Sequence, residues 1–162
     1  MCEYCGCRGV PPIAELMEEH DVILVDAHEV RAALRTGDRG EVVVRLRHLA
    51  THLDPHVRRE ERGVFAALRE QGDWIEEIVL LEGEHRDLDA GIAALDVRDP
   101  EFDRHVLDLL RDLEEHVERE NLGIFPVSVV TLGASGWEVV QRARDEIPTF
   151  LDDVPRSVLP DR

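Results

Sequence analysis

A histidine followed four residues later by a glutamate occurs twice in this chain, each time within a similar local sequence. The first pair is His56 with Glu60 and the second is His116 with Glu120, and a glycine and then a phenylalanine follow each pair. On an α-helix, residues four apart lie on one face, one turn from each other. Each pair therefore presents an imidazole and a carboxylate in a way that lets both reach one metal ion.

The residues before each pair place it on an apolar helix face. Apolar residues recur there at steps of three and four, namely Phe102, Val106, Leu109 and Leu113 before His116, and Val42, Leu46, Leu49 and Leu53 before His56. Such a stripe is the buried side of a bundle helix. A buried carboxylate is costly unless it is paired or binds a metal, and neither stripe contains Lys or Arg. A metal ion is the simplest partner for the two glutamates.

Two other amphipathic segments each carry one histidine on their apolar stripe. One is the first helical segment of the chain, which begins at Pro11-Pro12 and carries His20. The other is the third segment, which carries His85. Their apolar positions align with each other, so the second half of the chain repeats the first. Short connections between four long amphipathic helices favour an all-α, antiparallel up-down-up-down four-helix bundle.

Local signals predict where these elements begin and end. Thr36-Gly37-Asp38 should separate the first helix from the second, and Pro55 should kink or distort the second helix. Asp73 with Glu76 predicts the start of the third helix, and Asp99-Pro100 the start of the fourth. The second helix is expected to end near Gln71 and the fourth near Leu122. An apolar loop over 127–133, a fifth helix capped at Ser135 and ending near Ile147, and an extended tail should follow.

These boundaries divide the chain into three predicted parts. Residues 1–10 form a Cys-containing N-terminal arm, residues 11–126 form the four-helix bundle, and residues 127–162 form the short helix and the tail that pack on the bundle. The Glu-rich pairs Glu18-Glu19 and Glu114-Glu115 are expected to lie on solvated faces.

Composition narrows the classes of partner and compartment. The 162 residues carry a formal net charge of −17, and all 19 basic residues are arginine. This acidity argues against nucleic acid or an anionic membrane surface as a partner. No apolar run approaches the ~20 residues of a membrane helix, and the N-terminus lacks the features of a signal peptide. We therefore expect a cytoplasmic protein, while its protein partners stay unknown.

The motif elements His20, His56 with Glu60, His85, and His116 with Glu120 stand in the order H…HxxxE…H…HxxxE. Over roughly residues 13 to 126 the chain resembles the hemerythrin-like (HHE cation-binding) family. The resemblance implies a four-helix bundle with a non-haem di-iron centre that binds oxygen, or that in other members senses oxygen, handles peroxide or nitric oxide, or stores iron. The ferritin-like alternative needs Glu-x-x-His, an order that neither copy has.

One position departs from the oxygen-carrying hemerythrins. Those proteins have a second histidine one turn after the third-helix histidine, where this chain has Asp89. An iron ion with fewer protein ligands there favours a reactive, catalase- or peroxidase-like centre over simple oxygen carriage.

The repeat suits two iron ions better than one, because each half supplies two imidazoles and the two carboxylates can bridge. We expect an oxo- or hydroxo-bridged pair with a position for dioxygen, hydrogen peroxide or a small diatomic ligand. Asp89, His52 and Glu61 are candidate additional ligands. His52 lies one turn before His56, whereas Glu61 is rotated by about 100° from the apolar stripe.

Three cysteines in the N-terminal arm form a candidate second site. Cys2, Cys5 and Cys7 could hold zinc or iron with a fourth ligand from elsewhere, or act as redox-responsive thiols. The alternative is a loose terminus with incidental thiols. The arm also supports a second hypothesis for function, a non-enzymatic oxygen, redox or iron sensor that signals through these cysteines. A third hypothesis is a metal-free bundle that serves protein contacts.

Overall fold

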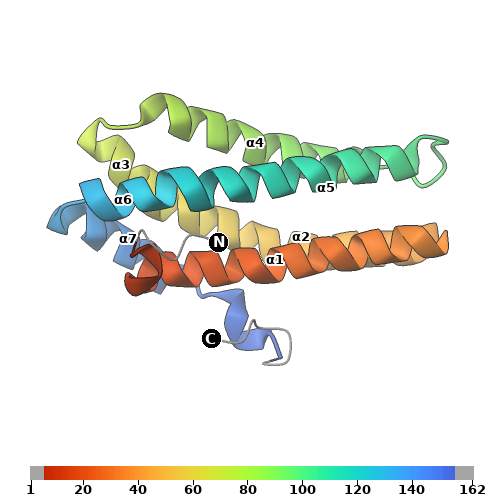
Figure 1. Ribbon diagram of the computed structural model, residues 1–162, viewed down its shortest axis with the longest axis horizontal. Coiled ribbons are helices and arrows are strands. Elements are labelled where there is room, and N and C mark those ends of the chain that lie inside the picture. The colour runs from red at the N-terminus through yellow and green to blue at the C-terminus, as the bar shows by residue number, and fades with distance from the viewer. Residues whose placement is uncertain (1–5, 156–162) are drawn as a thin grey trace.

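The computed structural model describes residues 6–155, which form helices and contain no strand within that range. Four long helices lie lengthwise beside one another in Figure 1, namely α1 (Pro11–Thr36), α2 (Arg39–Glu60), α4 (Ile75–Ala94) and α5 (Phe102–Arg119). Helix α1 packs against α2 and α5, and α4 packs against α5 and α2. The helices thus surround a common interior, as expected for a helical bundle. None of the described helices is both long and apolar enough to cross a membrane.

The turn between α1 and α2 follows the prediction. Gly37 ends α1 with a φ of 77°, a left-handed conformation that costs glycine little because it has no Cβ. Asp38 then caps α2, since its Oδ1 accepts a hydrogen bond from the backbone N–H of Glu41 at 3.1 Å. The predicted cap of α4 is wrong: Trp74, with a φ of 59°, precedes the helix and no side chain caps it.

Both helices that carry a His–Glu pair continue past it through a π-helical segment. After α2 come η2 (Glu61–Phe65) and α3 (Ala66–Gln71), and after α5 come η3 (Glu120–Ile124) and α6 (Phe125–Thr131). A π-helix bonds i to i+5, and short π segments occur often at functional sites. Each glutamate of the pairs therefore stands where the helix geometry changes.

These segments correct two predictions. The fourth helix does not give way to a loop after Leu122, because α6 continues to Thr131. Pro126 fits there, since it lies in the first turn of α6, where a missing N–H costs little. Helix α2 also passes through Pro55, and the departure from α-helical bonding comes at η2 instead.

The C-terminal part covers one side of the bundle. Helix α7 (Ala134–Glu146) confirms the predicted fifth helix, but Gly133 precedes it and no side chain caps it, so the predicted cap at Ser135 is wrong. Helix α7 packs against η2 and α3. The tail is not wholly extended, because a 3-10 turn, η4 (Phe150–Asp153), packs on α1 and α2. A shorter 3-10 turn, η1 (Cys7–Gly9), precedes α1.

The apolar core is divided into two clusters, with a polar layer between them. On α1, Ile13 to Met17 belong to one cluster and Val22 to Ala33 to the other, and His20 lies between. On α2 and its continuation, Leu49 and Val64 likewise belong to different clusters, on either side of the His–Glu pair. The predicted ligands therefore sit at one level across the middle of the bundle.

Candidate metal centre

The four histidines and two glutamates singled out in the sequence meet at this level. They come from every long helix: His20 from α1, His56 and Glu60 from α2, His85 from α4, His116 from α5, and Glu120 at the start of η3. All six are buried, and both glutamates are 0% exposed. The Nε2 atoms of the histidines lie 3.1–3.7 Å from carboxylate oxygens of the two glutamates.

The six side chains divide into two overlapping groups. His20 and His56 form one group with both glutamates, and His85 and His116 form the other with the same two glutamates. In each group the ligand atoms lie within 4.8 Å of one another. Because the glutamates belong to both groups, the six side chains form one connected set of candidate metal ligands, with two imidazoles in each group.

The buried polar atoms at the centre face only one another and make no hydrogen bond to any other group. These are Nε2 of His20, His56 and His85, and both carboxylate oxygens of Glu60 and of Glu120. An unpaired buried polar group costs about 1–3 kcal/mol, and a charged group costs more. So many in one place would be strongly destabilising unless metal ions, or protons on the histidines, balanced the two carboxylates. Imidazole with carboxylate is a donor set that iron accepts. The residues present therefore fit bound metal.

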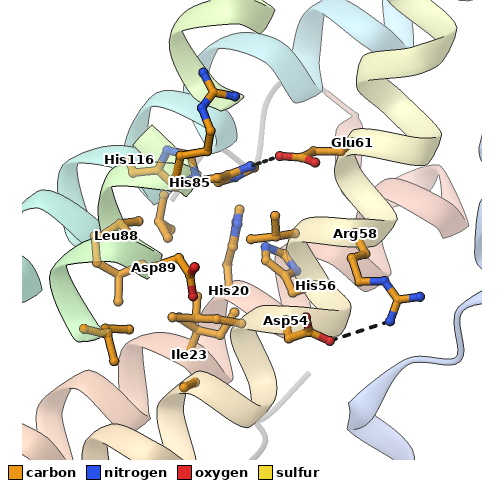
Figure 2. A pocket seen from close by; sticks show the side chains of 17 residues that line it. His20, Ile23, Asp54, His56, Arg58, Glu61, His85, Leu88, Asp89 and His116 are labelled. Carbon is orange, nitrogen blue, oxygen red and sulfur yellow. Dashed lines mark hydrogen bonds and ion pairs between the residues drawn. The ribbon is translucent and has the colours of Figure 1, made fainter. Parts of the chain in front are cut away.

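The other ring nitrogen of each histidine donates a hydrogen bond away from the centre. The acceptors are Glu19 for His56 (2.7 Å), Glu84 for His116 (2.8 Å), Glu61 for His85 (3.0 Å) and Asn121 for His20 (3.1 Å). Figure 2 shows the bond between His85 and Glu61. A proton held at Nδ1 leaves the lone pair at Nε2 facing inward, which is how metal-ligating histidines are normally oriented.

A comparison with protein families agrees with this geometry. The family model of the hemerythrin HHE cation-binding domain matches residues 11–128.

The chain belongs to the hemerythrin HHE cation-binding family. Searches of curated proteins and of solved structures found no match. Membership implies a metal-binding protein, with iron as the expected metal, and the two His and Glu groups of this hemerythrin domain could hold it.

Sequence reasoning missed part of the hydrogen-bond layer around the hemerythrin site. Glu19 was expected on a solvated face, but it is 0% exposed and also pairs with the buried Arg59. Glu84 has the matching position in the second repeat and pairs with Arg119. The sequence holds only part of the signal, namely that a glutamate directly precedes His20 and a second one precedes His85. Each of these glutamates, however, binds the histidine of a neighbouring helix.

A phenylalanine at the end of each π segment stacks on a histidine of α1 or α4. Phe65 is the last residue of η2, and Phe125 directly follows η3. Phe65 stacks on the His85 ring at a centroid distance of 5.8 Å, and Phe125 stacks on the His20 ring at 5.4 Å. Both phenylalanines are 0% exposed. Both belong to the core cluster that includes Ile13 and Leu16 of α1, so the imidazole rings are fixed by packing as well as by hydrogen bonds.

The charges at the centre shift the protonation of the metal-free site. Burial opposes a charge on His20, but Glu120 and Glu60 outweigh it and raise the pKa of His20 to about 10. Burial also lowers the pKa of His85, but Glu120, Glu60 and Glu61 outweigh it and raise that pKa to about 12. Burial in turn raises the pKa of Glu60, but the histidines, His56 foremost, outweigh it and hold that pKa well below its ordinary value. In the absence of metal, protons occupy the place of the cations.

A pocket of about 240 Å³ leads from the surface between α2 and α4 to all four histidines. Figure 2 shows their rings around a common space, with the carboxylate of Asp89 pointing into the pocket. Most of the wall is apolar, formed by residues such as Leu53, Leu88 and Ile92, and charged side chains including Asp89 and Glu61 line the rest. A small uncharged molecule could therefore reach the centre from solvent.

The three candidate additional ligands have different surroundings. Asp89 lines the pocket, although it does not belong to either ligand group. Glu61 also lines the pocket, where it accepts the hydrogen bond from Nδ1 of His85. It therefore orients that imidazole and does not face the centre itself. His52 lies away from the centre and bonds to Asp26 at 2.6 Å.

Of the cysteine arm, only Cys7 lies in the described part of the chain. It is 1% exposed and packs in a core cluster with Ile13 and Leu16. Its sulfur takes part in a disulfide bond, the oxidised state of a thiol, so in this structure it is not a thiolate that could bind a metal. Cys2 and Cys5 lie outside the described residues.

Proposed function

We propose that this hemerythrin-domain protein holds two non-haem iron ions in an antiparallel up-down-up-down bundle, and that it binds or reacts with dioxygen or hydrogen peroxide. The observation that carries the proposal is the sharing of Glu60 and Glu120 between two pairs of histidines. One ion would lie with His20 and His56 and the other with His85 and His116. Bound iron would supply redox electrons and a coordination position for the small molecule.

Each ion would have four protein ligand atoms if each glutamate gave it one oxygen. Iron in such N/O sites prefers about six ligands, so positions are left for solvent and for a small molecule. The pocket reaches the histidines from the α2–α4 side. Its apolar walls favour a neutral molecule over an ion, because an ion would lose its hydration there.

Asp89 supports a reaction over simple carriage. Its carboxylate points into the pocket (Figure 2) and is exposed to solvent, so it can exchange protons with water and with a molecule in the pocket. Reduction of peroxide to water consumes protons, and a carboxylate beside the pocket is suited to deliver them. Asp89 would thus position and protonate the substrate rather than complete the ligand set.

Anaerobic iron loading tests the proposal. The loaded protein should contain two irons per chain and should develop the charge-transfer absorption of a bridged di-ferric pair on exposure to air or peroxide. His116→Ala should lose this stoichiometry, whereas His105→Ala, which changes an exposed histidine bound to Asp99, should keep it. Two irons per chain in His116→Ala would refute the assignment. Steady consumption of peroxide by the loaded protein would identify an enzyme, and its absence a carrier or sensor.

A further inference from the structure

A second group of metal-ligand side chains lies outside the bundle centre, where α1, α2 and η4 meet. Asp26 comes from α1, and His48 and His52 come from successive turns of α2. Their ligand atoms lie within 4.8 Å of one another. Nδ1 of His52 is 2.6 Å from Oδ2 of Asp26, and Nε2 of His48 is 3.7 Å from Oδ1. The carboxylate thus has one imidazole at each oxygen.

The surroundings hold this group in place. The ring of Phe150 stacks on the ring of His52 at 4.3 Å with an interplanar angle of 11°. The Asp26 side chain is only 9% exposed. The nearby guanidinium of Arg45 is engaged by Glu41 at 2.6 Å and Glu29 at 3.3 Å. Asp26 therefore keeps two imidazoles, rather than an arginine, as its ion-pair partners.

Space and further oxygen donors are present beside these ligands. A hollow of about 320 Å³ is lined by Asp26, His48 and His52, by Glu29 of α1 and Asp153 of η4, and by Arg45, whose charge is balanced by Glu41 and Glu29. A cation held by the first three groups would face this hollow with its remaining positions. Water or one of the two added carboxylates could complete its coordination.

We propose that Asp26, His48 and His52 form a mononuclear site for a late first-row divalent cation, with Zn²⁺ as the best match. Two imidazole nitrogens and one carboxylate oxygen, with an open fourth position, are a common zinc donor set. Binding would displace the proton that joins His52 to Asp26. Since Phe150 and Asp153 belong to η4, the ion would also fasten the C-terminal segment to the α1–α2 hairpin.

Zinc titration of the iron-loaded protein tests this site without competition from the central ligands. A chromophoric chelator should report one Zn²⁺ per chain beyond the iron. His48→Ala should lower that affinity at least about 10-fold, because it removes one of three ligands and leaves a half-exposed position that does not support the core. His105→Ala is the matched control, since His105 is an exposed imidazole 3.6 Å from a carboxylate of Asp99.

Amide hydrogen exchange supplies a second measurement. Zinc should slow exchange in residues 150–153 of the wild-type chain and of His105→Ala, but not of His48→Ala. Equal zinc affinity in His48→Ala and the wild type would overturn the proposal, as would an equal loss in His105→Ala or the absence of any zinc binding beyond the iron. Because the readout is zinc and not oxygen chemistry, it can fail while the proposed function of the central site stands.

Discussion

Glu61 and Asn121 occupy equivalent positions in the two repeats, yet they give their histidines different hydrogen-bond acceptors. Each directly follows a central glutamate and lies in a π segment. The carboxylate of Glu61 accepts from Nδ1 of His85 at 3.0 Å, whereas the amide oxygen of Asn121 accepts from Nδ1 of His20 at 3.1 Å. An anionic acceptor makes the imidazole a stronger donor to metal than a neutral one does. The two halves of the centre are therefore chemically unequal.

Glu61→Gln should reduce this inequality. With the two ions proposed above, the ion held by His85 and His116 in the wild type should bind more tightly than the other, and an anaerobic metal titration should show two separate steps. Loss of an outer hydrogen-bond partner typically costs 10- to 100-fold in metal affinity, so we expect Glu61→Gln to weaken the tighter step by about 10-fold and to bring the steps together. Glu138→Gln, an exposed position on α7, should change neither step. Unchanged, separate steps in Glu61→Gln would contradict the argument.

Arg59 should be among the most costly residues to replace outside the ligand set. Its guanidinium pairs with Glu19 and Glu15, and its side chain is only 3% exposed. Arg59→Met would leave Glu19 buried without its cation, a change that typically costs about 3–5 kcal/mol. Urea denaturation should show this loss in the free energy of unfolding. Arg98→Met removes an exposed pair with Asp96 and should have no measurable effect, so similar midpoints for the two variants would rule out a stabilising role for the buried pair.

The sequence predicts well which polar residues gather at the centre of the bundle, because apolar periodicity indicates which residues face the interior. It could not predict Glu19 as a partner of His56, since periodicity does not say which groups of two different helices will touch. The end of the fourth predicted helix, expected near Leu122, was also wrong, because the helix continues to Thr131. A π segment has no simple residue signature, and it carries the helix through Gly123 and past the proline at 126. His52 was one turn from His56, but its small rotation around α2 directs it to Asp26.

Phe65→Ala should destabilise the bundle and loosen the His85 ring. Phe65 is 0% exposed and stacks on that ring, and truncation of a buried phenylalanine typically costs about 3–5 kcal/mol. Chemical denaturation of the metal-free chain should show this loss. Val130→Ala, at a position 83% exposed, should change stability by less than about 0.5 kcal/mol. If Phe65→Ala proved as mild as Val130→Ala, the side chain would not be packed as described.

The metal-free protein should lose stability as pH rises above neutrality. The pKa of His20 is raised from 6.5 to about 10 in the folded chain, so the unfolded state gives up its proton first. The stabilisation from this shift is complete below pH 6.5 and is lost as pH rises through about 10, because the folded state then also loses the proton. His85, with a pKa raised to about 12, extends the same trend. Urea denaturation between pH 6 and pH 10, after chelation, measures it.

Metal should remove most of this dependence, because a ligated imidazole must already be neutral. Binding of iron or zinc at the centre should therefore release protons at neutral pH. The metal affinity should rise with pH over the same range in which the metal-free chain loses stability. His20→Gln, which removes one titrating group, should flatten the pH profile of the metal-free protein even if it lowers stability overall. Stability of the metal-free chain that stays constant or increases up to pH 10 would mean that the two glutamates do not hold protons on the histidines.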